Sequence, residues 1–265
     1  RDVLGSRGLG DVYKRQAINK WVNDKTNGMI PKLHDDNYDK DTIMVLLNAL
    51  YMKADWAHKF EGNYTNDREF TKADGSTVTV PFMNMYEAYE SYIKTEDAEG
   101  IMLPYDDGRL AFIALKPGSG DARGYAASLT GAKLKEAIAA AKADTFVTVN
   151  MPKFSTGYSV YLTDALKAMG MTDAFDPFLA DLSGAGRGVD GPLYISYVFQ
   201  RVKVDVDEEG TEAAAVTEIA TAEGCALPAD EPIVLTFDKP FVYAIVDTET
   251  GVPLFAGVME NPEAK

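Results

Sequence analysis

The sequence has few of the residues from which most catalytic and metal-binding sites are built. Its 265 residues include one cysteine, Cys225, and two histidines, His34 and His58. A single cysteine excludes an internal disulfide and any site with several cysteine ligands. The chain also lacks a hydrolase nucleophile elbow, an HExxH zinc motif, a Walker loop and an EF-hand calcium loop. No local motif therefore predicts an enzyme, a metal or a cofactor.

Positive charge and long apolar runs are also scarce. Lys and Arg number 26 against 41 Asp and Glu, which gives a formal net charge of −15. Nucleic acids and anionic membrane surfaces bind through basic patches, so neither is expected as a partner. No apolar run approaches the roughly 20 residues that a membrane-spanning helix needs. With 46% hydrophobic residues, the composition is that of a globular domain.

A segment rich in small residues, EEGTEAAAVTEIATAEG at positions 208–224, has no single obvious conformation. Read with a period of two, it is a strand with one uncharged face, because Glu212 and Glu218 point to the other side. The uncharged face consists of Thr211, Ala213, Ala215, Thr217, Ile219 and Thr221. Read as a helix, the segment ends at Gly224 and has a thin apolar stripe. An exposed linker is the third alternative.

This segment stands between motifs that together resemble one family. Upstream are INKWVNDKTNGMI (18–30), LLNALYMKADWAHKF (46–60), VPFMNM (80–85), LPYDDGRLAFIALKP (103–117) and VNMPKFS (149–155), and downstream is FDKPFVYAIVDTETGVPLFAGVMENP (237–262). In this order the motifs resemble the serpin family of serine protease inhibitors. The resemblance covers nearly all of the chain after residue 16.

The resemblance implies an α+β serpin fold, with a large mixed sheet A, smaller sheets B and C, and surrounding helices. Compared with the family, the N-terminal helices and the first sheet strands are expected to be missing. Residues 1–16 match no serpin motif and have no sustained periodicity, so they are expected to be a non-native or unstructured segment. Residues 17–265 are then a partial serpin domain, with its reactive-centre loop at about residues 208–232.

The resemblance also implies a function. Serpins inhibit serine endopeptidases as suicide substrates: the protease attacks the loop and is acylated, and the loop then enters the main sheet as a strand. The chain is therefore expected to be the substrate-like inhibitor of a serine protease and not an enzyme. It is also expected to be a monomer and to be located outside the cell or at its surface. Some serpin relatives instead bind ligands or act as chaperones, and the small residues of this hinge favour inhibition over that alternative.

The loop residues are assigned by the same resemblance. Its hinge comprises Glu209, Gly210, Thr211, Glu212, Ala213, Ala214, Ala215 and Thr217. Counting from Gly210 by the family spacing places the scissile bond at Gly224-Cys225, with Ala226-Leu227 as a competitor. A small uncharged residue before the cleaved bond favours elastase-like or subtilisin-like proteases over trypsin-like ones.

Three further residues are assigned to the places where a serpin sheet opens. Trp56 matches the breach, where the loop first enters, and Asn48 and Gln200 match the shutter, where many serpins have a histidine in place of Gln200. Asn48 interrupts the apolar run IMVLLNALYM, which predicts a central strand buried on both faces. A buried amide needs hydrogen-bond partners, because leaving it unpaired costs roughly 1–3 kcal/mol.

The other elements follow from local patterns. We expect a helix over residues 17–22 that ends at Asn27-Gly28, and an antiparallel meander over residues 59–117 with turns at Asp74-Gly75 and Asp107-Gly108. Two further helices are expected at residues 129–143 and 158–169, the second closed by Gly170. Residues 183–191 read as a turn-rich connection rather than a phosphate loop, and residues 195–207 as a strand with one buried face.

Overall fold

The computed structural model describes residues 7–33, 43–186, 192–211 and 231–263. The chain divides into two compact units, Arg1–Tyr51 with Gly157–Lys203 (unit 1) and Met52–Thr156 with Val204–Lys265 (unit 2). Within the described ranges, no helix is both long enough and apolar enough to cross a membrane. The mixture of helices with one five-stranded and one eight-stranded sheet confirms the α+β class.

Unit 1 is built on a parallel pair of strands, β1 (Val45–Tyr51) and the first seven residues of β9 (Tyr197–Val206). Also in this unit are α1 (Arg7–Lys25), the end of β8 (Phe154–Tyr161), α4 (Thr163–Ala168) and the short 3-10 helix η2 (Asp173–Phe175). One core cluster joins the α1 end to β9 through Val22, Ile30, Leu33 and Phe199. A second joins Phe175, Ile195 and Val198.

Helix α1 begins earlier than the sequence predicts. Residues 7–16 are helical, so of the two alternatives expected for residues 1–16, non-native or unstructured, the second does not hold from Arg7 onward. Extending an existing helix by one residue is far easier than nucleating one, and Lys, Arg and Gln are good helix formers. The predicted end is confirmed: Asn27 and Gly28 have φ values of 48° and 85°, and the Gly28 amide donates to the Asn23 carbonyl at 2.8 Å.

Strand β1 is less buried than its apolar sequence suggests. Leu46 is 42% exposed, and Asn48 is exposed as well. Among the described strands β1 pairs only with β9, so it lies at a sheet edge. The expectation of a central strand buried on both faces is therefore wrong for this structure, and the Asn48 amide is not buried.

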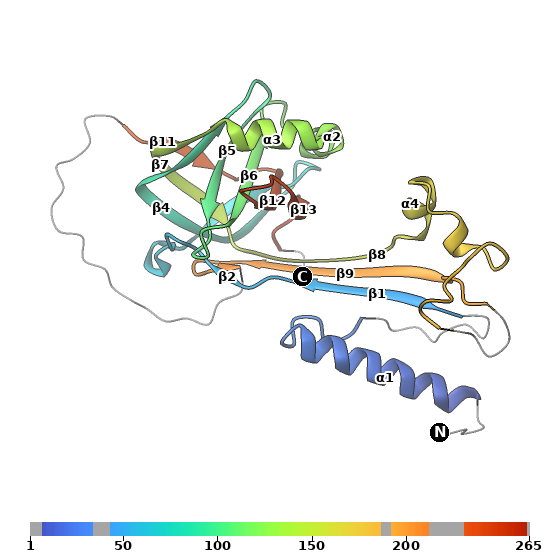
Figure 1. Cartoon of the computed structure of the whole chain (residues 1–265). Helices are drawn as coiled ribbons and strands as arrows, with labels where there is room; N and C mark the ends of the chain where they lie inside the picture. Colours follow the sequence, from blue (N-terminus) through green and yellow to red (C-terminus); the bar gives the residue numbers. More distant parts are fainter. Residues whose placement is uncertain (1–6, 34–42, 187–191, 212–230, 264–265) are drawn as a thin grey trace. The chain divides into compact units, whose positions relative to one another are not determined.

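Unit 2 is organised around an eight-stranded sheet (Figure 1). Its order is β11-β7-β4-β5-β6-β12-β13, and β3 pairs with β4. The strands are β3 (Asn66–Thr71), β4 (Thr77–Lys94), β5 (Ala98–Pro104), β6 (Leu110–Pro117), β7 (Ala141–Pro152), β11 (Ile233–Thr236), β12 (Phe241–Asp247) and β13 (Pro253–Met259). The predicted meander is confirmed, with Gly75 and Gly108 at φ values of 82° and 69° in its turns.

Helices α2 (Ala122–Ser128) and α3 (Gly131–Ala139) pack on this sheet, as Figure 1 shows. The Asp121 and Thr130 side chains cap them by accepting hydrogen bonds from the amides of Gly124 and Lys133. Their inner faces join a core that also contains residues of β4, β5, β6 and β12. This core includes Ile93, Ile113, Leu115, Tyr125, Leu134, Ala137, Val242 and Val246.

Both predicted helices are shorter than their sequence patterns. The helix expected at residues 129–143 ends at Ala139, because β7 begins at Ala141 and pairs with β4. The helix expected at residues 158–169 begins at Thr163, because β8 runs to Tyr161. Strand pairing overrides helix propensity in both cases. Gly170, with φ 99°, follows the second helix as predicted.

Candidate functional site

The predicted hinge begins with a tight turn in unit 2, between the end of β9 and β10 (Gly210–Thr211). The Asp207 carboxylate accepts hydrogen bonds from the amides of Glu209 (3.0 Å) and Gly210 (3.3 Å), and the Asp207 amide donates to the Gly210 carbonyl at 3.0 Å. Burial raises the pKa of Asp207, and the two amide bonds oppose this rise. The turn reverses the chain, so that Thr211 pairs with Val206 in antiparallel fashion.

Strand β10 is paired on both sides. Beyond its contact with β9, it pairs in antiparallel fashion with β2 (Ala54–Asp55), in the register Gly210↔Asp55 and Thr211↔Ala54. A Cβ atom added to Gly210 would lie 2.1 Å from the Ala54 carbonyl oxygen and 2.7 Å from Asp55 Cα. Real Cβ atoms do not approach backbone that closely, so this pairing requires glycine at position 210.

Buried aromatic rings pack against the hinge turn and bond to it. Trp56 is 2% exposed and stacks on Tyr105, with ring centroids 4.8 Å apart. The Trp56 indole donates to the Asp207 carbonyl (2.9 Å), and its amide donates to the Glu209 carbonyl (2.8 Å). The Tyr105 and Thr211 hydroxyls are 2.6 Å apart, and Thr211 is fully buried. Burial raises the pKa of Tyr105, so the phenol stays protonated.

Two carboxylates fasten the turn to its surroundings. Glu208 contacts Lys153 Nζ at 2.5 Å and accepts a hydrogen bond from the Thr65 hydroxyl at 2.6 Å. Burial alone would raise the pKa of Glu208, but the hydrogen bonds from Lys153 and Thr65 outweigh burial and lower it. Glu209 is bound by Lys59 at 2.7 Å, and Lys59 also binds Asp55 at 3.0 Å. These two carboxylates raise the pKa of Lys59.

The shutter residues lie in unit 1. Asn48 and Gln200 are direct Cα partners in the parallel pairing of β1 with β9. Gln200 is half-buried, whereas Asn48 is exposed. The structure therefore brings these two predicted site residues together, as neighbours on adjacent strands.

Comparisons with known proteins show which family the chain belongs to. The family model described as Serpin (serine protease inhibitor) matches residues 10–262. The chain is a serpin. The resemblance by motifs starts after residue 16, whereas the family model already matches from residue 10. The family match therefore includes part of the N-terminal segment.

Three similar proteins illustrate the relationship. Serpin B10 of Otolemur garnettii is 34% identical over 94% of this chain and 62% of its own length, and Iripin-5 of Ixodes ricinus is 36% identical over 92% and 61%. The crystal structure of the thermophilic serpin tengpin in its native state has a TM-score of 0.84 at 35% identity, covering 95% of this chain and 64% of that one. The fold is thus that of serpins, and the chain spans about three-fifths of the length of these relatives.

The structure unites some of the predicted site residues and leaves others undescribed. Trp56, Glu209, Gly210 and Thr211 form one cluster in unit 2. The predictions for Glu212, Ala213, Ala214, Ala215, Thr217, Gly224 and Cys225 fall outside the described residues.

The sequence did not predict the residues that contact the hinge turn: Lys59, Thr65, Tyr105, Lys153 and Asp207. Only Asp207 had a local signal, because an Asp three residues before a Gly is typical of a side-chain-capped turn.

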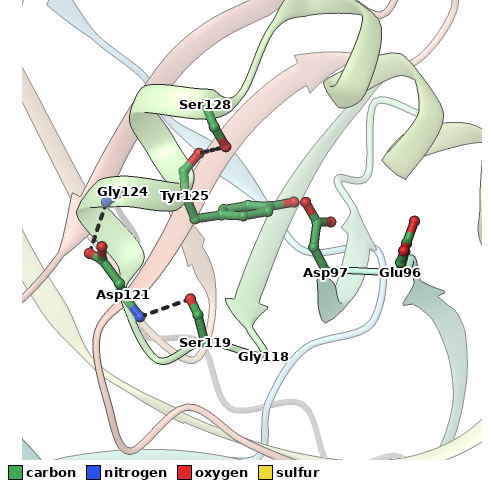
Figure 2. Close-up of a pocket in the computed structure, with 8 residues that line it drawn as sticks. All are labelled: Glu96, Asp97, Gly118, Ser119, Asp121, Gly124, Tyr125 and Ser128. Carbon is green, nitrogen blue, oxygen red and sulfur yellow. Dashed lines mark hydrogen bonds between the residues drawn. The ribbon is translucent and has the colours of Figure 1, made fainter.

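Unit 2 also has two surface hollows. One, of about 420 Å³, is lined by Glu96, Asp97, Gly118, Ser119, Asp121, Gly124, Tyr125 and Ser128 (Figure 2). Several of its polar groups are used by the turns that form it: Asp121 accepts from the Gly124 amide, and Ser119 from the Asp121 amide. The other, of about 500 Å³, adjoins Lys153 and Asp207. Over the described residues, His, Cys, Asp and Glu side chains form no group that could hold a metal ion.

Proposed function

We propose that the intact protein inhibits serine proteases as a suicide substrate. The family description, serine protease inhibitor, supports inhibition in general. Support for the insertion mechanism comes from β10. The first two residues of the loop strand are already hydrogen-bonded between β9 on one side and β2 on the other.

The register of β10 specifies where the rest of the loop would go. Thr211 lies opposite Val206 in the β10–β9 pairing and opposite Ala54 in the β10–β2 pairing. If both antiparallel registers continue, Thr217, six residues later in the chain, lies opposite the residues six positions earlier on the partner strands, which are Gln200 and Asn48. Those two residues are already Cα partners of each other. The two registers therefore agree on one path, in which the loop separates β1 from β9.

Insertion along this path would supply the energy for trapping. About fourteen residues from Thr211 to Gly224, at roughly 3.3 Å each, span about 46 Å. On the order of ten new ladder hydrogen bonds, at about 1 kcal/mol net each, give on the order of 10 kcal/mol. Disrupting an oxyanion hole slows catalysis by roughly 100- to 1,000-fold, equivalent to about 3–4 kcal/mol. Insertion therefore has enough free energy to stall deacylation of an attached protease.

We also propose the cleaved bond and the class of protease. The protease attacks the Gly224-Cys225 bond, and its small uncharged residue favours elastase-like or subtilisin-like enzymes. The protein acts as a monomer outside the cell or at its surface, and it performs no catalysis itself. A non-inhibitory binding or chaperone role is the competing function, and the test below separates the two.

The test compares two substitutions in the full-length gene product. In the proposed register Thr217 lies between Gln200 and Asn48, on the face of the sheet that the N-terminal helices of a full-length serpin are expected to cover. Glu218 lies on the other face and is already charged, so Glu218→Arg exchanges one charged side chain for another. Thr217→Arg would bury an unpaired charge at a cost of several kcal/mol, so insertion slows and deacylation wins. The variant is then cleaved as a substrate while pancreatic elastase or subtilisin survives. Glu218→Arg should still trap the protease.

The readout is the ratio of SDS-stable complex to cleaved inhibitor on a denaturing gel. If wild type forms no stable complex with either protease, the inhibitory proposal is overturned in favour of the binding role. If both variants lose trapping equally, or neither does, the proposed register is wrong.

A further inference from the structure

Two buried side-chain amides lie directly opposite each other in the eight-stranded sheet. Asn84 on β4 is 0% exposed, and Asn150 on β7 is 4% exposed. They are Cα partners in the antiparallel β4–β7 pairing. Side chains of directly opposed residues project from the same face of a sheet, with their Cβ atoms about 4.5–5.5 Å apart.

Both amides donate hydrogen bonds to neighbouring groups. Asn84 Nδ2 donates to the backbone carbonyls of Tyr64 (2.6 Å) and Phe82 (3.0 Å). Because carbonyls only accept, these two bonds fix which end of the Asn84 amide is the oxygen. Asn150 Nδ2 donates to the Thr236 hydroxyl oxygen at 3.1 Å.

The acceptors of both amides are not used. Asn84 Oδ1 and Asn150 Oδ1 are buried, and neither accepts a hydrogen bond within the described structure. A buried acceptor without a donor destabilises a fold, and native proteins satisfy the large majority of such groups. One water molecule carries two donors, so it can donate to both Oδ1 atoms at once through O–H···O bonds of about 2.8 Å. Buried waters typically bridge polar groups in this way.

We propose that Asn84 and Asn150 hold a bound water molecule that donates one hydrogen to each Oδ1 atom. This water closes a continuous polar clamp from the Tyr64 carbonyl, through Asn84 and Asn150, to Thr236 on β11. The clamp thus crosses from β4 to β11 through the intervening strand β7.

The clamp has a mechanical consequence for β11. This strand has four residues and lies at the edge of the described sheet. It exposes Ile233 (39%) and Val234 (61%), so Leu235, at 1% exposed, is its one buried side chain. Its end is fastened by the Asn150–Thr236 bond and by the Phe237 amide, which donates to the Asn150 carbonyl at 2.9 Å. The clamp would therefore hold the strand that follows the reactive-centre loop, a consequence that rests on the proposed function.

The water itself is tested on the unmodified 265-residue chain, without a protease. NMR cross-relaxation between water and the side-chain amide protons of Asn84 and Asn150 should show a long-lived bound water at both. Absence of water contacts at both amides would overturn the proposal. A crystal structure in which the two amides touch directly, with no water between the Oδ1 atoms, would overturn it as well.

The clamp is tested by a double-mutant cycle of Asn84→Leu and Asn150→Leu. A shared water predicts that the effects on hydrogen exchange of the β11 amides are non-additive by at least about twofold. Asn84→Leu alone should also accelerate exchange at Leu235 and Thr236, although Asn84 bonds to neither. Thr95→Val serves as the control, because its hydroxyl bonds to the Ala98 carbonyl just beyond the far end of β4. The effect of Thr95→Val on hydrogen exchange of the β11 amides should simply add to that of Asn84→Leu.

Additive effects of Asn84→Leu and Asn150→Leu on this exchange would overturn the clamp.

Discussion

Replacing Glu208 with Gln should loosen the hinge turn measurably. Glu208 has a side chain that is 14% exposed and is bound by Lys153 and Thr65. A hydrogen bond to a charged group contributes about 1.5–3 kcal/mol. The Lys153 side chain is 35% exposed, so solvent screening reduces this contribution to about 1–2 kcal/mol. Local opening should therefore become about 5- to 30-fold more frequent.

The effect should depend on pH in one direction. A carboxyl group whose folded pKa lies below its unfolded value stabilises the fold above the unfolded pKa, and this stabilisation is lost as pH falls through the folded pKa. The pKa of Glu208 is lowered from its ordinary 4.5. The difference between wild type and Glu208→Gln should therefore be complete at pH 7 and shrink progressively below about pH 4.5.

Hydrogen exchange at single amides measures this opening. The Phe60 amide donates to the Glu208 carbonyl and the Trp56 amide to the Glu209 carbonyl, so both report on the turn. Taking the ratio of mutant to wild-type rates at each pH cancels the intrinsic chemistry of exchange. Glu209→Gln is the matched control: its partner Lys59 is 43% exposed, so its effect should stay below about twofold. Equal effects of the two variants, or a Glu208 effect that persists unchanged at pH 3, would refute the reasoning.

Three further predictions concern the loop and its anchor. Gly210→Ala should lower Tm by about 2 °C or more, because its Cβ would overlap the β2 backbone. Gly131→Ala, in open space at the start of α3, should not lower it. Mass spectrometry of the cleaved protein should find a C-terminal peptide that begins at Cys225, and a start upstream of Glu223 would contradict the bond assignment. Cys225 should react rapidly with a thiol reagent before denaturation and more slowly in the protease complex; labelling only after denaturation would contradict its exposure.

The elements that the sequence predicted well are those bounded by local turn signals. Asp74-Gly75 and Asp107-Gly108 require a positive φ that glycine supplies, so the turns of the meander could be located from the chain alone. The overlong helix at residues 129–143 shows the opposite case. Lys142 and Ala143 have good helix propensity, but Ala141 pairs with Ile93 far away in the sequence, and no local pattern shows that pairing.

The candidate site was predictable only in part, for a similar reason. Trp56 and Gly210 were found through the family motifs, whereas Lys59 and Lys153 were not. Each lysine binds a glutamate more than 50 residues away in the sequence, and an exposed lysine looks the same with or without such a partner. The Asn84–Asn150 pair was also invisible, because its members become neighbours only through the β4–β7 register.

Strand β12, which follows β11, determines whether the two fragments stay together after the loop is cleaved. All seven residues of β12 are buried, and the strand pairs with β6 on one side and β13 on the other. Burying a Val, Ile or Phe side chain contributes about 1.5–3 kcal/mol, so β12 would hold its place without a covalent link to the loop. Cleavage at Gly224-Cys225 would thus yield a non-covalent dimer of unequal polypeptides that runs at its original size under native conditions. Only a denaturant would separate the small piece from the large one.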